Sequence, residues 1–266
     1  MIVRPARTVA LCAALLATAC ASPLIAKPAA KAHAAAAGHS AAARYGAALA
    51  DPARPAADRA RDAARMPAQL LAFAQIAKGA KVGDYVMGGG YLTRILAAAV
   101  GPKGHVYAFQ PAEFIGFKAQ YGTDQKSVDA AYANVDAVAG PFAAPAFPVP
   151  LDTIITVQNF HDLYLKPFPA DTGARASAAL FAALKPGGAL VVVDHSAKPG
   201  TGTSMADSLH RIDKAAVVAA LTKAGFKLEA ESQLYARPAD SRTVGVFDPS
   251  IRGKTDQFTL RFRKPK

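Results

Sequence analysis

The chain has 266 residues, of which 52% are hydrophobic, and its formal net charge is +12. A chain of this length and apolar content can bury one sizeable core, so we expect one globular domain with extensions. The basic balance suits anionic envelope components, but no recognisable nucleic-acid module accompanies it, so we expect no nucleic-acid partner. After the N-terminal region, no run of about 18 apolar residues predicts a membrane span.

The N-terminal region has the pattern of an export signal. Two arginines precede a short apolar stretch, and small residues follow it within residues 1–26. We therefore predict a signal peptide over this range and an exported protein of the periplasm or envelope, and we disfavour a cytoplasmic location. The residues before Cys20 also resemble a lipoprotein processing site, in which Cys20 would carry a lipid anchor. Cys12 is the only other cysteine, so the domain that follows has no thiol chemistry.

Alanine dominates residues 27–50, which contain few branched or aromatic side chains. Such a composition does not form a core of its own and predicts a flexible tether. The remaining residues, 51–266, are expected to form the domain. Its first helix is expected to begin at Asp51 and Pro52. Three arginines at helical spacing follow: Arg54, Arg61 and Arg65. We interpret them as a solvated charged face, and the alternative is that they face the ligand site.

A strand, a glycine turn, a helix and a second strand follow within residues 81–111. The apolar run Lys81–Met87 predicts a buried strand, and the glycines Gly88–Gly90 predict a tight turn. A helix with apolar spacing begins at Tyr91. Glycines at such a turn let a ligand approach the backbone closely, and the free N–H groups of the helix start favour an anionic group.

The rest of the chain alternates apolar strands with helices, which predicts right-handed crossovers and a mostly parallel sheet. Predicted strands cover residues 105–109, 135–138, 151–157, 189–193, 226–234 and 258–262. Predicted helices lie within residues 113–134, 174–184 and 214–224. Asp213 is placed to cap the last of these helices. The final strand follows a long loop instead of a helix.

Asp84, Gly88 and Gly90 match the first motif of class I S-adenosylmethionine-dependent methyltransferases, an acidic residue followed by glycines at the second, fourth and sixth places. Val86 replaces the second-place glycine. The resemblance continues through LDTIITVQNFHDL, LKPGGALVVVDHSA, HRIDKAAVVAALTKAGF and DPSIRGKTDQFTLRF. Over residues 51–266 the whole pattern resembles a bacterial group of exported, predicted methyltransferases.

This resemblance implies an α/β fold, a Rossmann-like, doubly wound and mostly parallel seven-stranded sheet with an antiparallel last strand and helices on both faces. It also implies S-adenosylmethionine as cofactor. Asp84 would lie near the cofactor's amino group, Gln110 near the ribose, where the family has an acidic residue, and Phe142 near the adenine. The alternative is that the glycines only make a tight turn. The predicted cofactor-binding residues are Asp84, Met87, Gly88, Gly89, Gly90, Tyr91, Gln110, Phe142 and Gln158.

Two His-Asp pairs follow predicted strands, so we expect both pairs in the crevice at the carboxyl ends of the sheet. His161 would deprotonate a methyl acceptor while Asp162 orients its ring and Asn159 positions the acceptor. The alternative is that Asp162 caps the next helical turn. Asp194 and His195 end the following strand, which makes His195 a second catalytic candidate.

Three functions follow from these observations. The resemblance favours S-adenosylmethionine-dependent methyl transfer to an unknown acceptor, a small molecule or an envelope component, with positioning as the main source of rate. The second is a metal-dependent enzyme, since two histidines and a carboxylate can hold a divalent metal. Its ligands would be His161, Asp162, Asp194 and His195. The third is a non-catalytic envelope binding protein that retains the fold.

Overall fold

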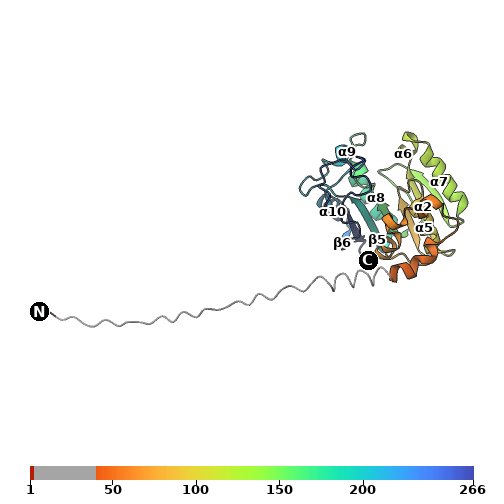
Figure 1. Cartoon of the computed structure of the whole chain (residues 1–266), viewed down its shortest axis with the longest axis horizontal. Helices are drawn as coiled ribbons and strands as arrows, with labels where there is room; N and C mark the ends of the chain where they lie inside the picture. The colour runs from red at the N-terminus through yellow and green to blue at the C-terminus, as the bar shows by residue number, and fades with distance from the viewer. Residues whose placement is uncertain (3–39) are drawn as a thin grey trace. The chain divides into compact units, whose positions relative to one another are not determined.

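A seven-stranded sheet forms the centre of the domain in the computed structural model of this chain (Figure 1). The structure describes residues 1–2 and 40–266. Most of the predicted signal peptide, the lipid anchor predicted at Cys20 and residues 27–39 of the predicted tether lie outside the described residues. The predicted domain, residues 51–266, lies within them.

The strands follow the predicted order along the chain. They are β1 (Lys81–Tyr85), β2 (His105–Pro111), β3 (Val135–Gly140), β4 (Leu151–Val157), β5 (Leu184–His195), β6 (Lys227–Ser232) and β7 (Gln257–Arg263). In the sheet their order is β3-β2-β1-β4-β5-β7-β6. Strands β1 to β5 pair in parallel, whereas β7 pairs antiparallel with β5 and β6. The predicted doubly wound fold is therefore confirmed, with the strand order reversing between β1 and β4.

Helices connect the strands. They are α2 (Ala56–Arg59), α3 (Asp62–Arg65), α4 (Pro67–Phe73), α5 (Tyr91–Val100), α6 (Ala112–Phe117), α7 (Gln120–Ala131), η1 (His161–Tyr164), α8 (Thr172–Ala183), α9 (Ala206–Leu209) and α10 (Lys214–Lys223). Asp213 caps α10 as predicted, since its Oδ1 accepts a hydrogen bond from the Ala215 amide at 3.0 Å. The helix start expected at Asp51 is wrong: Asp51 accepts from the Ala53 amide in a turn, and α2 begins only at Ala56.

Two apolar clusters cover the two faces of the sheet, which explains why the central strands read as continuous apolar runs. Successive side chains of a strand point to opposite faces, so Val191 of β5 belongs to one cluster and Val192 to the other. The first cluster includes side chains of α4, α5 and α7, and the second includes side chains of α8 and α10. Helices on both faces were predicted and are observed.

A helix over residues 40–49 precedes the domain boundary that the sequence predicts. Its side chains Ala41, Tyr45 and Ala48 are buried, and the Tyr45 hydroxyl donates to the carbonyl oxygen of Ile76 at 2.8 Å. The flexible tether predicted for residues 27–50 is therefore wrong for residues 40–49. Alanine composition hid a short apolar stripe that packs against α4.

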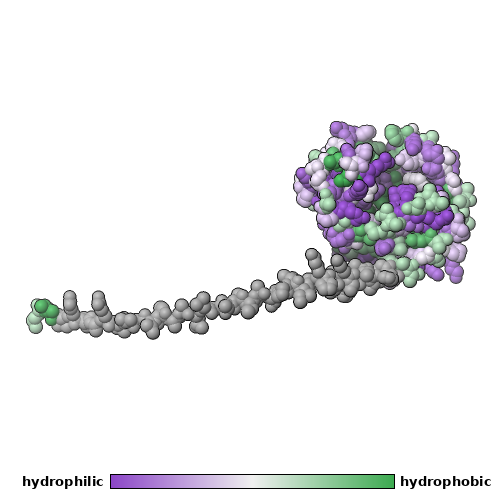
Figure 2. Space-filling model, in the orientation of Figure 1, coloured by the Kyte–Doolittle hydropathy of each residue, from purple (hydrophilic) through white to green (hydrophobic). Residues whose placement is uncertain are grey.

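The visible surface of the domain mixes hydrophilic and hydrophobic residues (Figure 2). Within the described part of the chain, no helix is both long enough and apolar enough to cross a membrane. Phe117 and Phe247 are the most exposed large apolar side chains of the domain, at 88% and 63%.

Candidate functional site

A cavity of about 1390 Å³ lies at the carboxyl ends of β1, β4 and β5. Pockets for one small ligand usually measure about 300–1000 Å³, so this cavity has room for two ligands. It lies where the strand order reverses, the place at which doubly wound sheets bind ligands. It brings together ten residues predicted from the sequence: Asp84, Met87, Gly88, Gly89, Tyr91, Gln158, Asn159, His161, Asp162 and His195.

The glycine turn after β1 presents open backbone to this cavity. Gly88 has φ +56°, and a Cβ added there would meet no atom within 4 Å. A Cβ added at Gly89 would meet only the Asp124 carboxylate, at 3.7 Å. The space above both residues therefore belongs to the cavity, and any side chain at either position would extend into it.

Gly90 has a different role from the one predicted. It does not line the cavity, and it precedes α5 with φ +79° while a Cβ there would lie 2.6 Å from Cγ2 of Val128 on α7. Gly90 thus allows α5 and α7 to pack closely, and its predicted contact with the cofactor is corrected.

We expect Gly90→Ala to destabilise the fold by about 2–4 kcal/mol, because it adds both overpacking and a left-handed alanine. Gly89→Ala is the matched control, and we expect a change below about 1 kcal/mol because its Cβ has room. Urea unfolding of the two variants measures the difference, and equal midpoints would contradict this assignment.

Two of the cavity residues that follow the strands β1 and β4 hold backbone conformations that are unusual for their type. Val86, which replaces the second glycine of the motif, has φ +67°, and Gln158 after β4 has φ +63°. Left-handed conformations cost roughly 1–3 kcal/mol for residues other than glycine and concentrate at functional sites. Val86 therefore preserves the backbone conformation that glycine favours, and the departure from the motif does not change the path of the turn.

Asp84 places a buried carboxylate at the cavity. It is 3% exposed, and its Oδ2 accepts a hydrogen bond from the Thr93 hydroxyl at 2.6 Å. Burial raises the pKa of Asp84 to about 6, although the bond from Thr93 opposes this shift. No cationic side chain of residues 40–266 lies within 4 Å of it. A cationic group of a ligand would satisfy this carboxylate.

Two predicted cofactor contacts lie outside the cavity lining. The Gln110 side chain is fully buried, and its Oε1 accepts a hydrogen bond from the Gly88 amide at 3.0 Å, so it supports the glycine turn from behind. The Phe142 ring is also fully buried and packs 5.0 Å from Phe114 and 5.6 Å from Tyr85, centroid to centroid. Neither side chain lines the cavity, so the structure does not place Gln110 at a ribose or Phe142 at an adenine, and both contacts stay predictions.

Arginines on α3 and its N-terminal flank line the cavity, which was the alternative to the solvated charged face favoured from the sequence. Arg61 and Arg65 line the cavity, and their guanidinium groups lie 5.1 and 4.9 Å from the centre of the Tyr91 ring. Among the described residues, no carboxylate lies within 4 Å of the Arg65 guanidinium. Arg54 is instead fully buried and pairs with Asp62 at 2.6 Å.

His161 is bound on both sides of its ring. Its Nδ1 lies 2.7 Å from Asp194 Oδ1, and its Nε2 lies 3.1 Å from Asp162 Oδ1 and 3.3 Å from His210 Nδ1. Burial lowers the pKa of His161, but Asp194 and Asp162 outweigh it and raise the pKa to about 10. The predicted base is therefore held between two carboxylates, and both of its ring nitrogens already have partners.

His195 differs from His161 in its electrostatics. Burial and the neighbouring His161 lower the pKa of His195 to about 4, so its ring is neutral at pH 7. Its Nδ1 lies 2.9 Å from the Thr255 hydroxyl, and the residue lines the cavity. Asn159 also lines the cavity, with its amide donating to the Val157 carbonyl oxygen at 2.7 Å. His195 thus presents an uncharged ring, which can accept a hydrogen bond, to the cavity.

Several cavity residues were not predicted as site residues, because they come from segments far apart in the sequence. His210 follows α9, the loop between β6 and β7 contributes Phe247, Arg252 and Thr255, and α6 contributes Phe114 and Phe117. The set of ligands predicted for a metal also changes, because His210 lies close to His161 and Asp162. Asp194 instead contacts the other ring nitrogen of His161, Nδ1. The His195 ring is centred 6.0 Å from the His161 ring.

No protein-family model and no curated protein matches this sequence. Among solved structures, an S-adenosylmethionine-dependent methyltransferase from Aquifex aeolicus is 18% identical with a TM-score of 0.51, over 74% of this chain and 89% of its own. A TehB-like S-adenosylmethionine-dependent methyltransferase from Corynebacterium glutamicum is 16% identical with a TM-score of 0.50, over 78% and 95%. The 4+2 cyclase SpnF is 17% identical with a TM-score of 0.53, over 76% and 81%.

At these identities the likeness concerns the fold, and SpnF shows that proteins of this fold are not all named for methyl transfer. Function has to be argued from the residues of the cavity. The domain has the fold of the S-adenosylmethionine-dependent methyltransferases.

Proposed function

We propose that the protein binds S-adenosylmethionine in the cavity and transfers its methyl group to an acceptor that occupies the same cavity. One observation carries this proposal: a single cavity contains the open glycine turn at Gly88 and Gly89 and, at the ends of the neighbouring strands, the polar residues Asn159, His161 and His195. Its volume exceeds that of a pocket for one small ligand.

The residues around the turn fit the amino-acid part of this cofactor. Asp84 offers a buried carboxylate for an ammonium group, and Arg65 offers a guanidinium for a carboxylate. The glycine turn leaves open space next to the backbone. The acidic residue that contacts the ribose in the family is replaced by Gln110, whose side chain supports the turn. We therefore expect no charge-assisted hydrogen bond to the ribose.

S-adenosylmethionine supplies a sulfonium-bound methyl group that is reactive without further activation. The protein then has to exclude water and hold the acceptor in line, which supplies most of the rate. His195 accepts a proton from an acceptor hydroxyl or amine, with Thr255 fixing its ring. Asn159 is bonded through its amide nitrogen, which leaves its carbonyl oxygen to position the acceptor.

The N-terminal sequence pattern extends this proposal to location: the protein acts as an exported protein of the periplasm or envelope, on a small molecule or an envelope component. The positive net charge of the protein would attract it to anionic components of the envelope.

Isothermal titration of the full-length chain with S-adenosylmethionine and with S-adenosylhomocysteine tests cofactor binding. We expect saturable binding of one molecule of either ligand per chain. No heat and no thermal shift at millimolar ligand would contradict methyl transfer and favour the non-catalytic binding protein.

Arg65→Gln should weaken the binding of S-adenosylhomocysteine by roughly 10- to 100-fold, because a charge-assisted hydrogen bond contributes about 1.5–3 kcal/mol. Arg175→Gln on α8 is the matched control, since Arg175 is exposed and does not line the cavity. Titration of both variants measures the effect. Equal affinities would show that Arg65 does not hold the ligand's carboxylate.

A further inference from the structure

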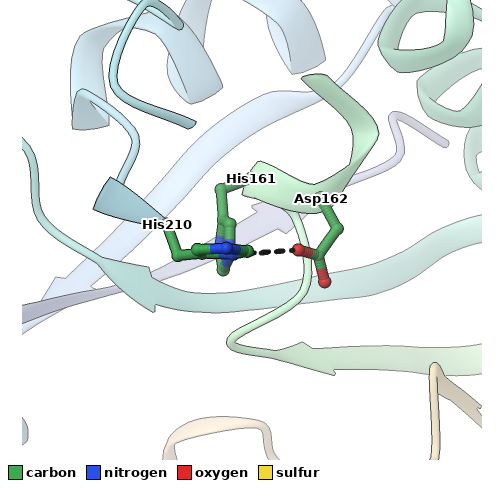
Figure 3. Close-up of side chains that lie close together, drawn as sticks. All are labelled: His161, Asp162 and His210. Carbon is green, nitrogen blue, oxygen red and sulfur yellow. Dashed lines mark hydrogen bonds and ion pairs between the residues drawn. The ribbon is translucent and has the colours of Figure 1, made fainter. Parts of the chain in front are cut away.

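We propose that His161, Asp162 and His210 form a binding site for one divalent transition-metal ion of the Zn²⁺ or Fe²⁺ type. The three side chains converge on one point although His210 lies 48 positions or more from the other two (Figure 3). All three line the large cavity. The inference goes beyond methyl transfer, because metal binding needs neither the cofactor nor an acceptor.

The distances between the three ligand atoms match those around a bound metal. His161 Nε2 lies 3.1 Å from Asp162 Oδ1 and 3.3 Å from His210 Nδ1, and Asp162 Oδ1 lies 3.8 Å from His210 Nδ1. Ligands about 2.0–2.1 Å from a tetrahedral metal lie roughly 3.3 Å from one another. One ion at the centre of this triangle therefore requires only small side-chain movements.

Asp194 holds His161 in the orientation that a metal ligand needs. Its Oδ1 lies 2.7 Å from His161 Nδ1, and its Oδ2 accepts a hydrogen bond from the His161 amide at 2.7 Å. Metal-binding histidines commonly donate their second ring nitrogen to a carboxylate, which fixes the tautomer and strengthens the ligand. With Nδ1 bonded to Asp194, Nε2 is the nitrogen that faces Asp162 and His210.

His210 is held toward the cluster by its backbone and by an aromatic neighbour. It has φ +52°, a left-handed conformation that is costly for histidine and that persists only where the surroundings enforce it. Its ring packs edge-on against Phe247, with centroids 4.8 Å apart, and perpendicular to the His161 ring at 5.4 Å. If residue 210 served only to form a turn, glycine would adopt this left-handed conformation at lower cost than histidine.

The donor set defines the class of metal. Two imidazoles and one carboxylate suit Zn²⁺, Fe²⁺ and similar ions, whereas Mg²⁺ and Ca²⁺ prefer oxygen ligands. Three protein ligands leave at least one coordination position free. Because the cluster lines the cavity, that position is open to water or to a ligand in the cavity.

The same contacts also describe a hydrogen-bonded network without metal, so the test has to detect the ion itself. The full-length chain is stripped with a chelator, dialysed and titrated with Zn²⁺ by calorimetry and with Co²⁺ by visible absorption. We expect one ion per chain and the d–d absorption bands of Co²⁺ in a site of low coordination number.

His210→Ala should weaken Zn²⁺ binding at least 100-fold and abolish the Co²⁺ bands. Asp194→Asn should weaken binding 10- to 100-fold through the orientation of His161. Circular dichroism establishes that each variant is folded. His210→Ala is the decisive variant, because His210 is partly exposed and its removal disturbs the fold least.

Controls use the other histidines of the chain. His105→Ala removes a partly exposed histidine that pairs with Asp136 at 3.0 Å, and the double variant His33→Ala, His39→Ala removes the two histidines that precede residue 40 in the sequence. Neither should change the affinity of the 1:1 site. Absence of binding at millimolar Zn²⁺, or equal binding by wild type and His210→Ala, would overturn the proposal. The titrations contain no cofactor, so their failure is distinct from a failure to bind S-adenosylmethionine.

Discussion

Gly89→Asp is expected to weaken the binding of S-adenosylhomocysteine by at least about 100-fold, or roughly 2.7 kcal/mol. The open space above Gly89 is where the amino-acid part of the cofactor would lie, and the new side chain fills it. The added carboxylate also lies near Asp124, so it increases the negative charge that the ligand's own carboxylate meets. The measurement is isothermal titration of the variant and the wild type under identical conditions.

Gly46→Asp is the matched control for this variant. A Cβ at Gly46 would meet no atom within 4 Å, and the residue does not line the cavity. We expect wild-type affinity for the control. If Gly89→Asp is folded and binds as tightly as Gly46→Asp, the cofactor does not lie over the glycine turn, and the assignment of the turn is wrong.

Arg211→Ala is expected to destabilise the domain by about 3–5 kcal/mol, the cost of leaving one charge of a buried ion pair without its partner. The Arg211 and Asp240 side chains are both fully buried and lie 2.8 Å apart, and Arg211 also donates to the carbonyl oxygens of Ser196 and Val244. The pair joins the end of β5 to the loop that supplies Thr255 to the cavity. Urea unfolding measures the loss.

Lys214→Ala is the control for this prediction, because Lys214 and Glu231 form an exposed pair at 2.5 Å. Exposed ion pairs contribute about 1 kcal/mol or less, so we expect only a small change. Similar losses in the two variants would show that the Arg211 pair does not fasten the loop.

The same pair predicts how stability depends on pH. Burial raises the pKa of Asp240, but the amides of Asp256 and Arg242 and the Arg211 guanidinium outweigh it, so the pKa of Asp240 in the folded protein lies below its ordinary value. The stability that this carboxylate contributes is therefore present above its unfolded pKa of about 3.9 and is lost as the pH falls through the folded pKa. In the Asp240→Asn variant, the free energy of unfolding should fall less steeply over that acidic pH range.

The fold was predictable because local signals agreed with one another. The apolar run before Gly88, the helix start at Tyr91 and the cap at Asp213 each mark an element boundary that the structure shows. The alternation of strands and helices predicts the parallel sheet. The helix over residues 40–49 was missed because alanine is apolar but small, and Tyr45 is the only aromatic side chain of this alanine-rich segment.

The cavity was predictable only in part. Residues at the carboxyl ends of strands, such as Asp84 and His161, were found because topology alone brings them together. Gln110 and Phe142 were expected at the cavity but are buried beside it, because the direction of a side chain depends on tertiary packing, which spacing does not report. His210 was missed because its neighbour Asp213 explained the segment as a cap, while its contact with His161 spans 49 residues.

A crystal structure of the protein with S-adenosylhomocysteine tests the central claim most directly. We predict ligand density in the cavity beyond β1 and β4, with the amino-acid part over Gly88 and Gly89, its ammonium group at Asp84 and its carboxylate at Arg65. The thioether would then face the side of the cavity that contains His195. Density elsewhere on the domain, or an empty cavity at saturating ligand, would contradict the proposal that this cavity binds the cofactor and the acceptor together.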